Sequence, residues 1–496
     1  MTRGREQQRA AERRVLQLLH GRATRTHIRE IHARLLRQHL HFSNLLLAHL
    51  VSVCAALRRV PYACRLFLSH PSPSLPLFNA TLKALSLSPA AAPDALRLFS
   101  LLRCRSLSPD RLSFAPLLKA TSFLPPALGR SIHALTLVSG FAAHPPVAVG
   151  ILEIYTSSGE MDSAHRAFDE MFQKDVVAYN LMINGYCKRG DFESGFRLFR
   201  WMGDRSIVTW NSMIAGLARC GQDGEALELF REMWDYSGFE PDDATLSTIL
   251  PVCGRLGALD VGRWIHYHAD GKGLLKSAVN VVNSIIDMYC KCGDLAAAQL
   301  VFDEMPKKSV VSWNAMIMGS AFNGHGRVGI NLFEEMKRSG AEPNAETFVG
   351  VLGCCTHVGL VKRGRELFAS MVEDYGIEPK LEHYGCMIDL LGRRGFVREA
   401  HELVRSMPTR PNAAIWGALL GACRNYGELG IAEMAMRELI ELEPRNSGNY
   451  VLLANLYAEA GRWEEAENVR WLMKGKSVPK VPGQSLIGHE DRVEEN

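Results

Sequence analysis

Apolar side chains recur along this chain at intervals of three and four residues, in many short segments. In one segment Ala226, Leu229, Phe230 and Met233 stand at positions i, i+3, i+4 and i+7. This spacing places all four side chains on one face of a helix. Because the same spacing returns elsewhere, for example over residues 298–305, the pattern predicts a chain built of many short amphipathic helices.

These segments close on a repeated Phe-x-x-Met motif that has a nearly fixed period. Phe168, Phe199 and Phe230 are 31 residues apart, as are Phe302 and Phe333. A fixed period in this range indicates a solenoid, in which stacked units share a continuous core. The Phe and Met pairs are Phe168/Met171, Phe199/Met202, Phe230/Met233, Phe302/Met305, Phe333/Met336 and Phe368/Met371.

A second short helix is expected before each of these segments, close to an aromatic–Asn pair. In the clearest unit we expect this helix over residues 314–321. A turn with a basic residue and a glycine, such as Lys188-Arg189-Gly190, follows it. The glycine suits a left-handed helix end, and the cation complements the helix C-terminus. Each unit is therefore predicted to be a helical hairpin, which must stack on its neighbours to bury its apolar face. The aromatic–Asn pairs are Phe78-Asn79, Tyr179-Asn180, Trp210-Asn211 and Trp313-Asn314.

Together these motifs resemble the pentatricopeptide repeat family over most of the chain, and the alternation of 31-residue with 35–36-residue units resembles its plant PLS subclass. The resemblance implies an all-α fold, a right-handed superhelical solenoid of helix-turn-helix repeats. It places a repeat array of about eleven repeats, the first of them degenerate, over residues 41–412. Beyond it, Ile415-Trp416-Gly417 and its neighbours resemble an E-type extension of two helical hairpins over 413–480. Residues 481–496 are expected to be a polar, disordered tail.

Composition changes this picture mainly at the N-terminus. The net charge of +4 is compatible with a nucleic-acid partner without requiring one. No uninterrupted apolar run reaches about 18 residues, so no membrane span is expected. Residues 1–40 hold ten arginines against three glutamates, which is typical of an organelle transit peptide. The alternative is that part of this segment forms a helical cap on the solenoid.

The chain shows none of the motifs that would make it an enzyme. Its twelve cysteines form no Cys-x-x-Cys pair, so we interpret them as reduced core residues rather than metal ligands. Some members of the family end in a cytidine-deaminase-like DYW domain, whose chemistry needs His-x-Glu and Pro-Cys-x-x-Cys. None of the 17 histidines has Glu two residues later. We therefore expect no DYW deaminase domain, no catalytic residue, no metal and no cofactor.

The resemblance implies that each reading unit recognises one RNA base through its fifth and its last residue. Repeat proteins of this kind use two or three side chains for one base. Asn can donate and accept toward a pyrimidine; a last-position Asp accepts from uracil N3–H, Ser donates to cytosine N3, and Asn can do either. The alternative is that these residues cap helices. The predicted pairs are Asn79 with Asp110, Asn180 with Ser206, Asn211 with Asp242, Asn283 with Ser309, and Asn314 with Asn344.

Two further groups complete the expected interface. By resemblance, the second residue of a unit is an apolar wedge between neighbouring bases, here Val177, Val208 and Val311. Cations at the turns could contact phosphate, or could be solvated charges at helix ends: Lys188, Arg219, Arg255 and Lys291. Four other units would space the RNA without reading it; their pairs are Ala115 with His144, Val149 with Asp175, Ser247 with Ala278, and Val349 with Lys380. The base choice of unit 381–412, with Gly385 and Asn412, stays open.

The family resemblance implies a sequence-specific single-stranded RNA-binding protein of a plant organelle, the mitochondrion or alternatively the chloroplast. The E-type extension implies a site-recognition factor for C-to-U RNA editing, with a DYW-type deaminase protein supplied in trans through residues 413–480. The same binding could instead serve splicing, stabilisation or translation of an organellar transcript. An alternative of another class is a protein–protein interaction scaffold. No small-molecule substrate is expected.

Overall fold

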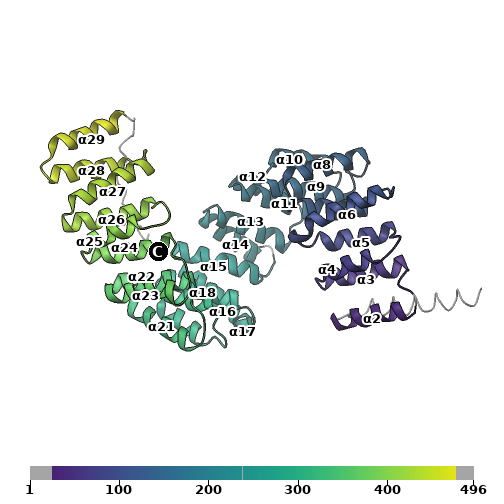
Figure 1. Cartoon of the computed structure of the whole chain (residues 1–496), viewed down its shortest axis with the longest axis horizontal. Helices are drawn as coiled ribbons and strands as arrows, with labels where there is room; N and C mark the ends of the chain where they lie inside the picture. Colours follow the sequence, from purple (N-terminus) through teal and green to yellow (C-terminus); the bar gives the residue numbers. More distant parts are fainter. Residues whose placement is uncertain (1–24, 39, 237, 476–496) are drawn as a thin grey trace, which may run out of the picture. The chain divides into compact units, whose positions relative to one another are not determined.

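The computed structural model, which describes residues 25–38, 40–236 and 238–475, consists of helices joined by short turns (Figure 1). Those ranges contain no β-strand. The chain divides into two compact units, one running to residue 249 and the other starting at 250. Each unit is a stack of helical hairpins, so the predicted all-α solenoid of helix-turn-helix repeats is confirmed.

In the first unit, the first helix of each hairpin packs against the first helix of the next hairpin and against its own partner. The row of first helices is α3, α5, α7, α9, α11 and α13. The helices are α2 (Arg25–Arg37), α3 (Asn44–Ala56), α4 (Val60–Leu68), α5 (Leu75–Leu85), α6 (Ala92–Cys104), α7 (Arg111–Thr121), α8 (Pro126–Val138), α9 (Pro145–Ser158), α10 (Met161–Glu170), α11 (Val176–Lys188), α12 (Phe192–Trp201), α13 (Ile207–Arg219) and α14 (Asp223–Tyr236), with the 3₁₀ turn η1 (Pro89–Ala91); α15 (Asp243–Leu256) begins here and ends in the second unit.

The second unit repeats this arrangement, with α18, α20, α22, α24 and α26 forming its row of first helices. The helices are α16 (Leu259–Gly271), α17 (Leu274–Ser277), α18 (Val279–Lys291), α19 (Leu295–Asp303), α20 (Val310–Phe322), α21 (Gly326–Arg338), α22 (Ala345–Val358), α23 (Val361–Glu373), α24 (Leu381–Arg393), α25 (Val397–Arg405), α26 (Ala413–Tyr426), α27 (Leu429–Leu442), α28 (Ser447–Glu459) and α29 (Trp463–Gly475). No helix in the described ranges combines the length and the apolar character needed to cross a membrane.

Local sequence explains where the helices begin and end. Ser309 accepts a hydrogen bond from the backbone N–H of Ser312 and starts α20 at Val310. The expected helix over 314–321 is therefore too short at its start, because the cap at Ser309 begins the helix four residues before the Asn. The predicted left-handed glycines are confirmed, with φ of 82° at Gly190 and 85° at Gly293.

The closing Phe of one hairpin packs edge-on against the aromatic residue that precedes Asn in the next hairpin. The ring centroids of Phe199 and Trp210 are 4.9 Å apart, as are those of Phe302 and Trp313. Edge-to-face pairs at this distance are a favourable aromatic geometry. The closing Phe and the aromatic residue before Asn recur with the same period because they meet in the same interface between hairpins.

The described part of the N-terminal segment is helical. In α2, Ile28 and Leu35 are fully buried, and the helix packs against α3. Helix α2 therefore packs onto the end of the first unit. This agrees with the alternative that part of residues 1–40 forms a helical cap on the solenoid. The transit-peptide interpretation was made for residues 1–40, of which 1–24 and 39 lie outside the described residues, as does the predicted tail over residues 481–496.

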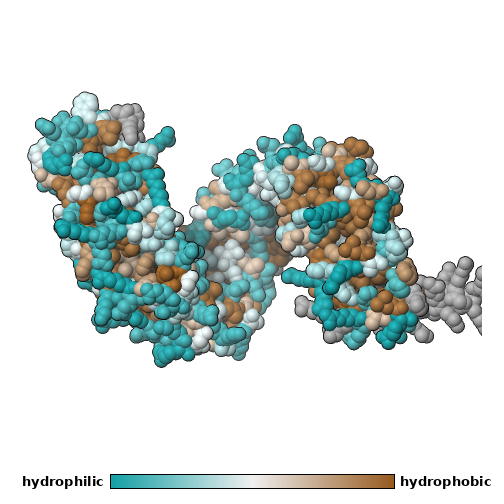
Figure 2. All heavy atoms as spheres, in the orientation of Figure 1, coloured by the Kyte–Doolittle hydropathy of each residue, from teal (hydrophilic) through white to brown (hydrophobic). Residues whose placement is uncertain are grey.

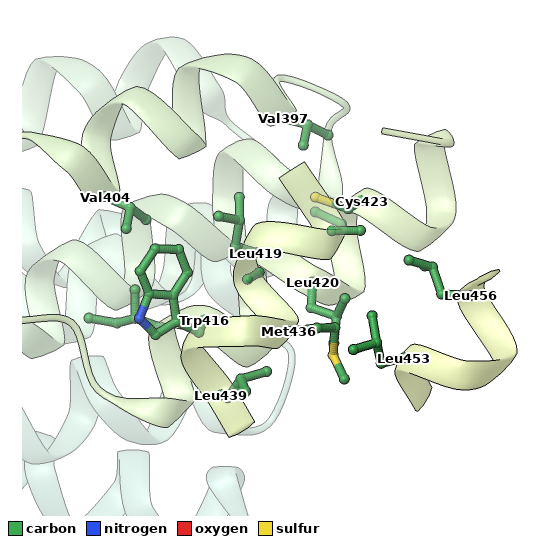
Figure 3. Packing of buried hydrophobic residues seen from close by; sticks show 14 of the residues in the cluster. Val397, Val404, Trp416, Leu419, Leu420, Cys423, Met436, Leu439, Leu453 and Leu456 are labelled. Carbon is green, nitrogen blue, oxygen red and sulfur yellow. The ribbon is translucent and has the colours of Figure 1, made fainter. Parts of the chain in front are cut away.

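The hydrophobic core continues without interruption across residue 412. Buried side chains of α24 and α25, among them Ile388 and Val397, belong to the same cluster as Trp416 of α26 and Leu453 of α28 (Figure 3). The helices of residues 413–475 therefore extend the stack of hairpins rather than forming a separately packed domain.

Candidate nucleic-acid interface

Three of the five predicted reading pairs are joined by a direct hydrogen bond between side chains. In each, Nδ2 of the fifth-position Asn donates to Oδ1 of the last residue over 3.0 Å, although the two residues are 30 or 31 positions apart. The stack of hairpins thus brings both residues to one place. The bonded pairs are Asn79 with Asp110, Asn211 with Asp242, and Asn314 with Asn344.

The last residue of each of these units is also the cap of the following helix. Oδ1 of Asp242 accepts from the backbone N–H of Thr245 over 2.9 Å, and Asp110 caps α7 in the same way. The capping alternative is therefore confirmed for the last-position residues. It is wrong for the fifth-position Asn residues, because Asn79 and Asn211 lie inside α5 and α13.

Asp110 and Asp242, which each cap a helix, both keep their second carboxylate oxygen, Oδ2, for a donor from outside the protein. Within the described chain, the hydrogen bonds that the side chains of Asp110 and Asp242 accept fall on Oδ1. Burial works to raise the pKa of the Asp242 carboxyl, but hydrogen bonds from Thr245, from Asn211 and from the backbone of Ala244 outweigh it, so the pKa lies below its usual value. Asp242 is thus ionised at neutral pH and can only accept a hydrogen bond.

The two pairs that end in serine are arranged differently. Within the described chain no hydrogen bond joins Asn180 to Ser206 or Asn283 to Ser309. Both serines cap the helix that follows. Oδ1 of Asn180 is buried without a hydrogen-bond partner. Sequence position alone therefore did not guarantee contact between the two members of a pair.

The amide of Asn314 is engaged more heavily than the others. Its Nδ2 donates to Asn344 and also lies 3.3 Å from Oε2 of Glu346. Both N–H groups of this amide thus have acceptors inside the protein. A base could receive a hydrogen bond from Asn314 only if Glu346 moved away.

Sequence reasoning missed a buried hydroxyl beside most of these asparagines. It comes from the third residue of the next first helix, and it donates to Oδ1 of the Asn. The hydroxyl-to-Oδ1 distances are 2.6 Å for Ser113 with Asn79, 2.6 Å for Thr245 with Asn211, 2.7 Å for Ser312 with Asn283, and 2.6 Å for Thr347 with Asn314. A usable signal was present: Ser or Thr stands there after every unit with a fifth-position Asn.

The predicted wedge positions carry exposed apolar side chains. Val177, Val208 and Val311 are 52%, 57% and 56% exposed. Each is the second residue of its helix, three residues before Asn, so the two lie on neighbouring positions of one helix face. Leu112 holds the same place on α7 and is 60% exposed. Apolar side chains reach the surface across the view in Figure 2.

The predicted phosphate contacts differ in their surroundings. Lys188 and Arg219 are exposed at the ends of α11 and α13. Nζ of Lys291 lies 2.7 Å from a carboxylate oxygen of Asp287, one turn earlier on α18. Arg255 is exposed near the end of α15. Lys291 would thus have to exchange its partner in order to bind phosphate.

Most of the cysteines are buried or partly buried. All twelve cysteines are free thiols, and Cys104 is the exposed one. Burial raises the pKa of Cys290 and of Cys354 to about 12. Among the described residues no cluster of three or more His, Cys, Asp or Glu side chains could hold a metal ion. His266 meets the hydroxyl of Tyr289 at 3.0 Å, between α16 and α18.

A hollow of about 400 Å³ opens between α26 and α28. The other first helices of this unit pack directly on one another, but α26 and α28 do so only weakly. Gly417 and Gly421 form one wall, and Arg424 and Glu443 add opposite charges. The hollow lies on the fifth-position side of α26, since Gly417 is its fifth residue.

Comparison with known proteins agrees with the repeat architecture. Models described as "PPR repeat family" match residues 174–207, 205–255 and 308–357, and models described as "PPR repeat" match 272–306 and 382–411. A model described as "E motif" matches residues 426–488. The crystal structure of the pentatricopeptide repeat protein PPR10 from maize has a TM-score of 0.50 at 16% identity, covering 93% of this chain and 85% of that chain, and is thus similar in fold.

Two relatives are similar to this chain over nearly their whole length. A pentatricopeptide repeat-containing protein of Arabidopsis thaliana is 50% identical over 478 residues, which is 96% of this chain and 98% of that protein. A second from the same plant is 40% identical, over 96% of this chain and 90% of that protein. The chain therefore belongs to the pentatricopeptide repeat family, in the plant PLS type with an E extension.

Proposed function

We propose that this protein binds single-stranded RNA in a plant organelle, with one base per reading unit, and selects cytidines for C-to-U editing. A DYW-type deaminase supplied by another protein would carry out the chemistry. The mitochondrion is the proposed compartment and the chloroplast the alternative, on the basis of the arginine-rich segment 1–40.

The observation that carries RNA reading is the bonded Asn and Asp pair. In units 75–110 and 207–242, the Asn amide donates a hydrogen bond to one carboxylate oxygen of the Asp, and the second carboxylate oxygen is left for a base. An ionised carboxylate accepts from uracil N3–H and repels the lone pair of cytosine N3. Exposed valines two residues into the helix supply the apolar surface that could separate neighbouring bases.

The editing role is supported by the E motif and by the hollow beside it. The matched segment, 426–488, includes α28, and the hollow between α26 and α28 offers a place for a partner's side chain. We propose that residues 413–480 recruit the deaminase through this surface. The expected order of recognition, reading the units from the 5′ end as the family implies, is U-N-N-C-U-N-C-Y from unit 75–110 onward.

The test is a binding titration of the full chain against synthetic RNA with this order and against a shuffled RNA of equal composition. Salt must be fixed, because phosphate contacts make affinity salt-dependent. The triple variant Asn79→Ala, Asn211→Ala, Asn314→Ala should lose the preference for the ordered RNA. A chain that binds both RNAs equally, or neither, would instead favour the protein–protein scaffold.

A plant that lacks the protein separates editing from other uses of the same binding. Sequencing of organellar transcripts should show a cytidine that is no longer converted, lying a few nucleotides 3′ of the recognised segment. Intact conversion at every site, together with a defect in splicing or transcript abundance, would point to the alternative roles.

A further inference from the structure

The buried hydroxyls beside the asparagines form a repeated arrangement across both units of the chain. Each belongs to the third residue of the helix that follows the reading unit, and Ser113, Thr245, Ser312 and Thr347 are all fully buried. Each also accepts from the backbone N–H of the last residue of the reading unit, as Thr245 does from Asp242 over 3.2 Å. The hydroxyl therefore touches both members of the pair.

At Thr245, counting protons fixes the direction of the hydroxyl's bond. A hydroxyl has one proton, and Oγ1 of Thr245 lies 2.6 Å from Oδ1 of Asn211 and 2.9 Å from Oδ1 of Asp242. The Asp242 oxygen already accepts from the backbone of Thr245 and from Nδ2 of Asn211. The proton therefore goes to the Asn oxygen, which leaves that amide one N–H and one lone pair for a base.

The Asp242 carboxylate decides which way the Asn211 amide points, and the Thr245 hydroxyl holds the amide there. If the Asn211 amide were reversed, its oxygen would face Oδ1 of Asp242 with no proton between them, and its nitrogen would face the hydroxyl. In unit 207–242 the carboxylate, which can only accept, therefore sets the orientation of the amide, and the hydroxyl holds the amide in it by donating to its oxygen. In unit 279–309 no bond joins Asn283 to Ser309 within the described chain, so Ser312 alone holds the Asn283 amide through its 2.7 Å bond.

The residue types along the chain follow the same rule. The third helix residue is Ser or Thr after each unit with a fifth-position Asn: Ser113, Thr209, Thr245, Ser312 and Thr347. After units without that Asn it has no hydroxyl: Val147, Ala178, Val281, His383 and Ile415. All ten positions are buried. A cap alone does not explain the difference, because Ala178 follows the capping Asp175 without a hydroxyl.

We infer that the hydroxyls of Ser113, Thr245, Ser312 and Thr347 are positioning residues that hold the reading amide in place, so that each of these four base sites is built by two consecutive repeats. The inference rests on the proposed RNA reading and deepens it. Base choice at one RNA position then depends on a residue in the repeat assigned to the next base. Ser312 should matter most, because nothing else in the described chain holds Asn283.

The experiment measures base preference at one RNA position with the full chain. For Thr245→Val, which removes the hydroxyl and keeps the shape, the RNAs differ in U or A at the base of unit 207–242. For Ser312→Ala they differ in C or A at the base of unit 279–309. We expect the preference to fall by about five-fold or more for each, the size of a weak to moderate base contact. Ser312→Ala should lose the larger share of its preference.

Two controls separate orientation from folding and capping. Thr245→Ser keeps the hydroxyl and should keep the preference for U. Thr209 accepts from the backbone of Ser206 as the others do, but it makes no bond to Asn180. Thr209→Val should therefore leave base choice at unit 176–206 unchanged. Thermal melting of each variant checks that it is folded.

The outcomes distinguish this inference from the proposed function. If the unmodified chain shows no base preference at these positions, the RNA reading itself is wrong. If it shows a preference that folded Thr245→Val and Ser312→Ala both retain, only the positioning role is overturned. If Thr209→Val reduces base choice as strongly as Thr245→Val, capping and not amide orientation is responsible, and the inference fails.

Discussion

The amide nitrogen of Asn211 donates to a carboxylate oxygen of Asp242 over 3.0 Å, across 31 residues of sequence. The first residue lies inside α13 and the second caps α15. The hairpin between them returns the chain to the start of the next first helix. One repeat length of chain thus brings the two residues of the proposed base site together. Changing either residue tests what the site does.

Changing the second member of this pair should change the base that is read. Asp242→Ser replaces an ionised acceptor with a hydroxyl that can donate to cytosine N3. The preference at the base of unit 207–242 should move from U toward C by about ten-fold or more, the effect of one good base contact. The measurement is a titration on two RNAs that differ only at this base.

The neighbouring residue is a matched control for that change. Asp243 is also exposed and also acidic, but it stands in the first turn of α15 rather than at its cap. Asp243→Ser removes the same charge and should leave the U-to-C ratio unchanged. Equal shifts for both variants would show that net charge, and not the Asn211–Asp242 pair, sets the preference.

Removing a closing phenylalanine should destabilise the repeat that contains it. Phe230 is 2% exposed, and Phe230→Ala should cost about 3–5 kcal/mol because the buried ring leaves a cavity. Phe172 is 96% exposed and serves as the control, since Phe172→Ala removes no buried surface. Denaturant unfolding followed by circular dichroism compares the two. A neutral Phe230→Ala would mean that the ring is not part of the core.

Filling the hollow between α26 and α28 tests the proposed recruitment surface. A side chain at Gly417 meets no atom within 4 Å, so Gly417→Phe can occupy the hollow without a backbone clash. RNA binding should be unchanged and editing in the plant should be lost. Gly224→Phe on α14, where a side chain also meets nothing within 4 Å, should edit normally. Editing that persists in Gly417→Phe would remove the hollow from the proposal.

Gly417→Phe tests recruitment more cleanly than a truncation after residue 412 would. Leu419 and Leu420 of α26 share a buried cluster with Ile388 and Leu391 of α24. Removing α26 would therefore expose the core of the repeat array. A truncated protein could lose RNA binding by unfolding, which says nothing about recruitment.

Stability should fall as the solution is made mildly acidic. Burial lowers the pKa of His133 and of His266 below the ordinary value of 6.5. The unfolded chain therefore takes up these protons first, so stability is full above about pH 6.5 and declines as the pH falls toward the folded-state values. Melting temperatures between about pH 7.5 and about pH 5.5 should show this decline. The double variant His133→Gln, His266→Gln should flatten it; an unchanged slope would assign the decline to other groups.

The repeat architecture was readable from the sequence because it depends on local order. The spacing of Ala226, Leu229, Phe230 and Met233 determines which face of a helix is apolar, and the period of Phe199 and Phe230 determines how often a hairpin starts. Turn glycines such as Gly190 need a left-handed backbone wherever the hairpin lies. These features require no knowledge of distant neighbours.

What only the tertiary structure decided is which of the aligned residues touch. The sequence placed Asn180 with Ser206 and Asn211 with Asp242 on equal terms, yet only the second pair is bonded. The recurrence of Ser or Thr after these units marked Thr245 and Thr209 alike, yet of the two only the Thr245 hydroxyl meets its Asn, Asn211, 34 residues earlier. The reason is physical: helical periodicity fixes the direction of a side chain, whereas a hydrogen bond also needs a separation near 3 Å. That separation is set by how one hairpin packs on the next.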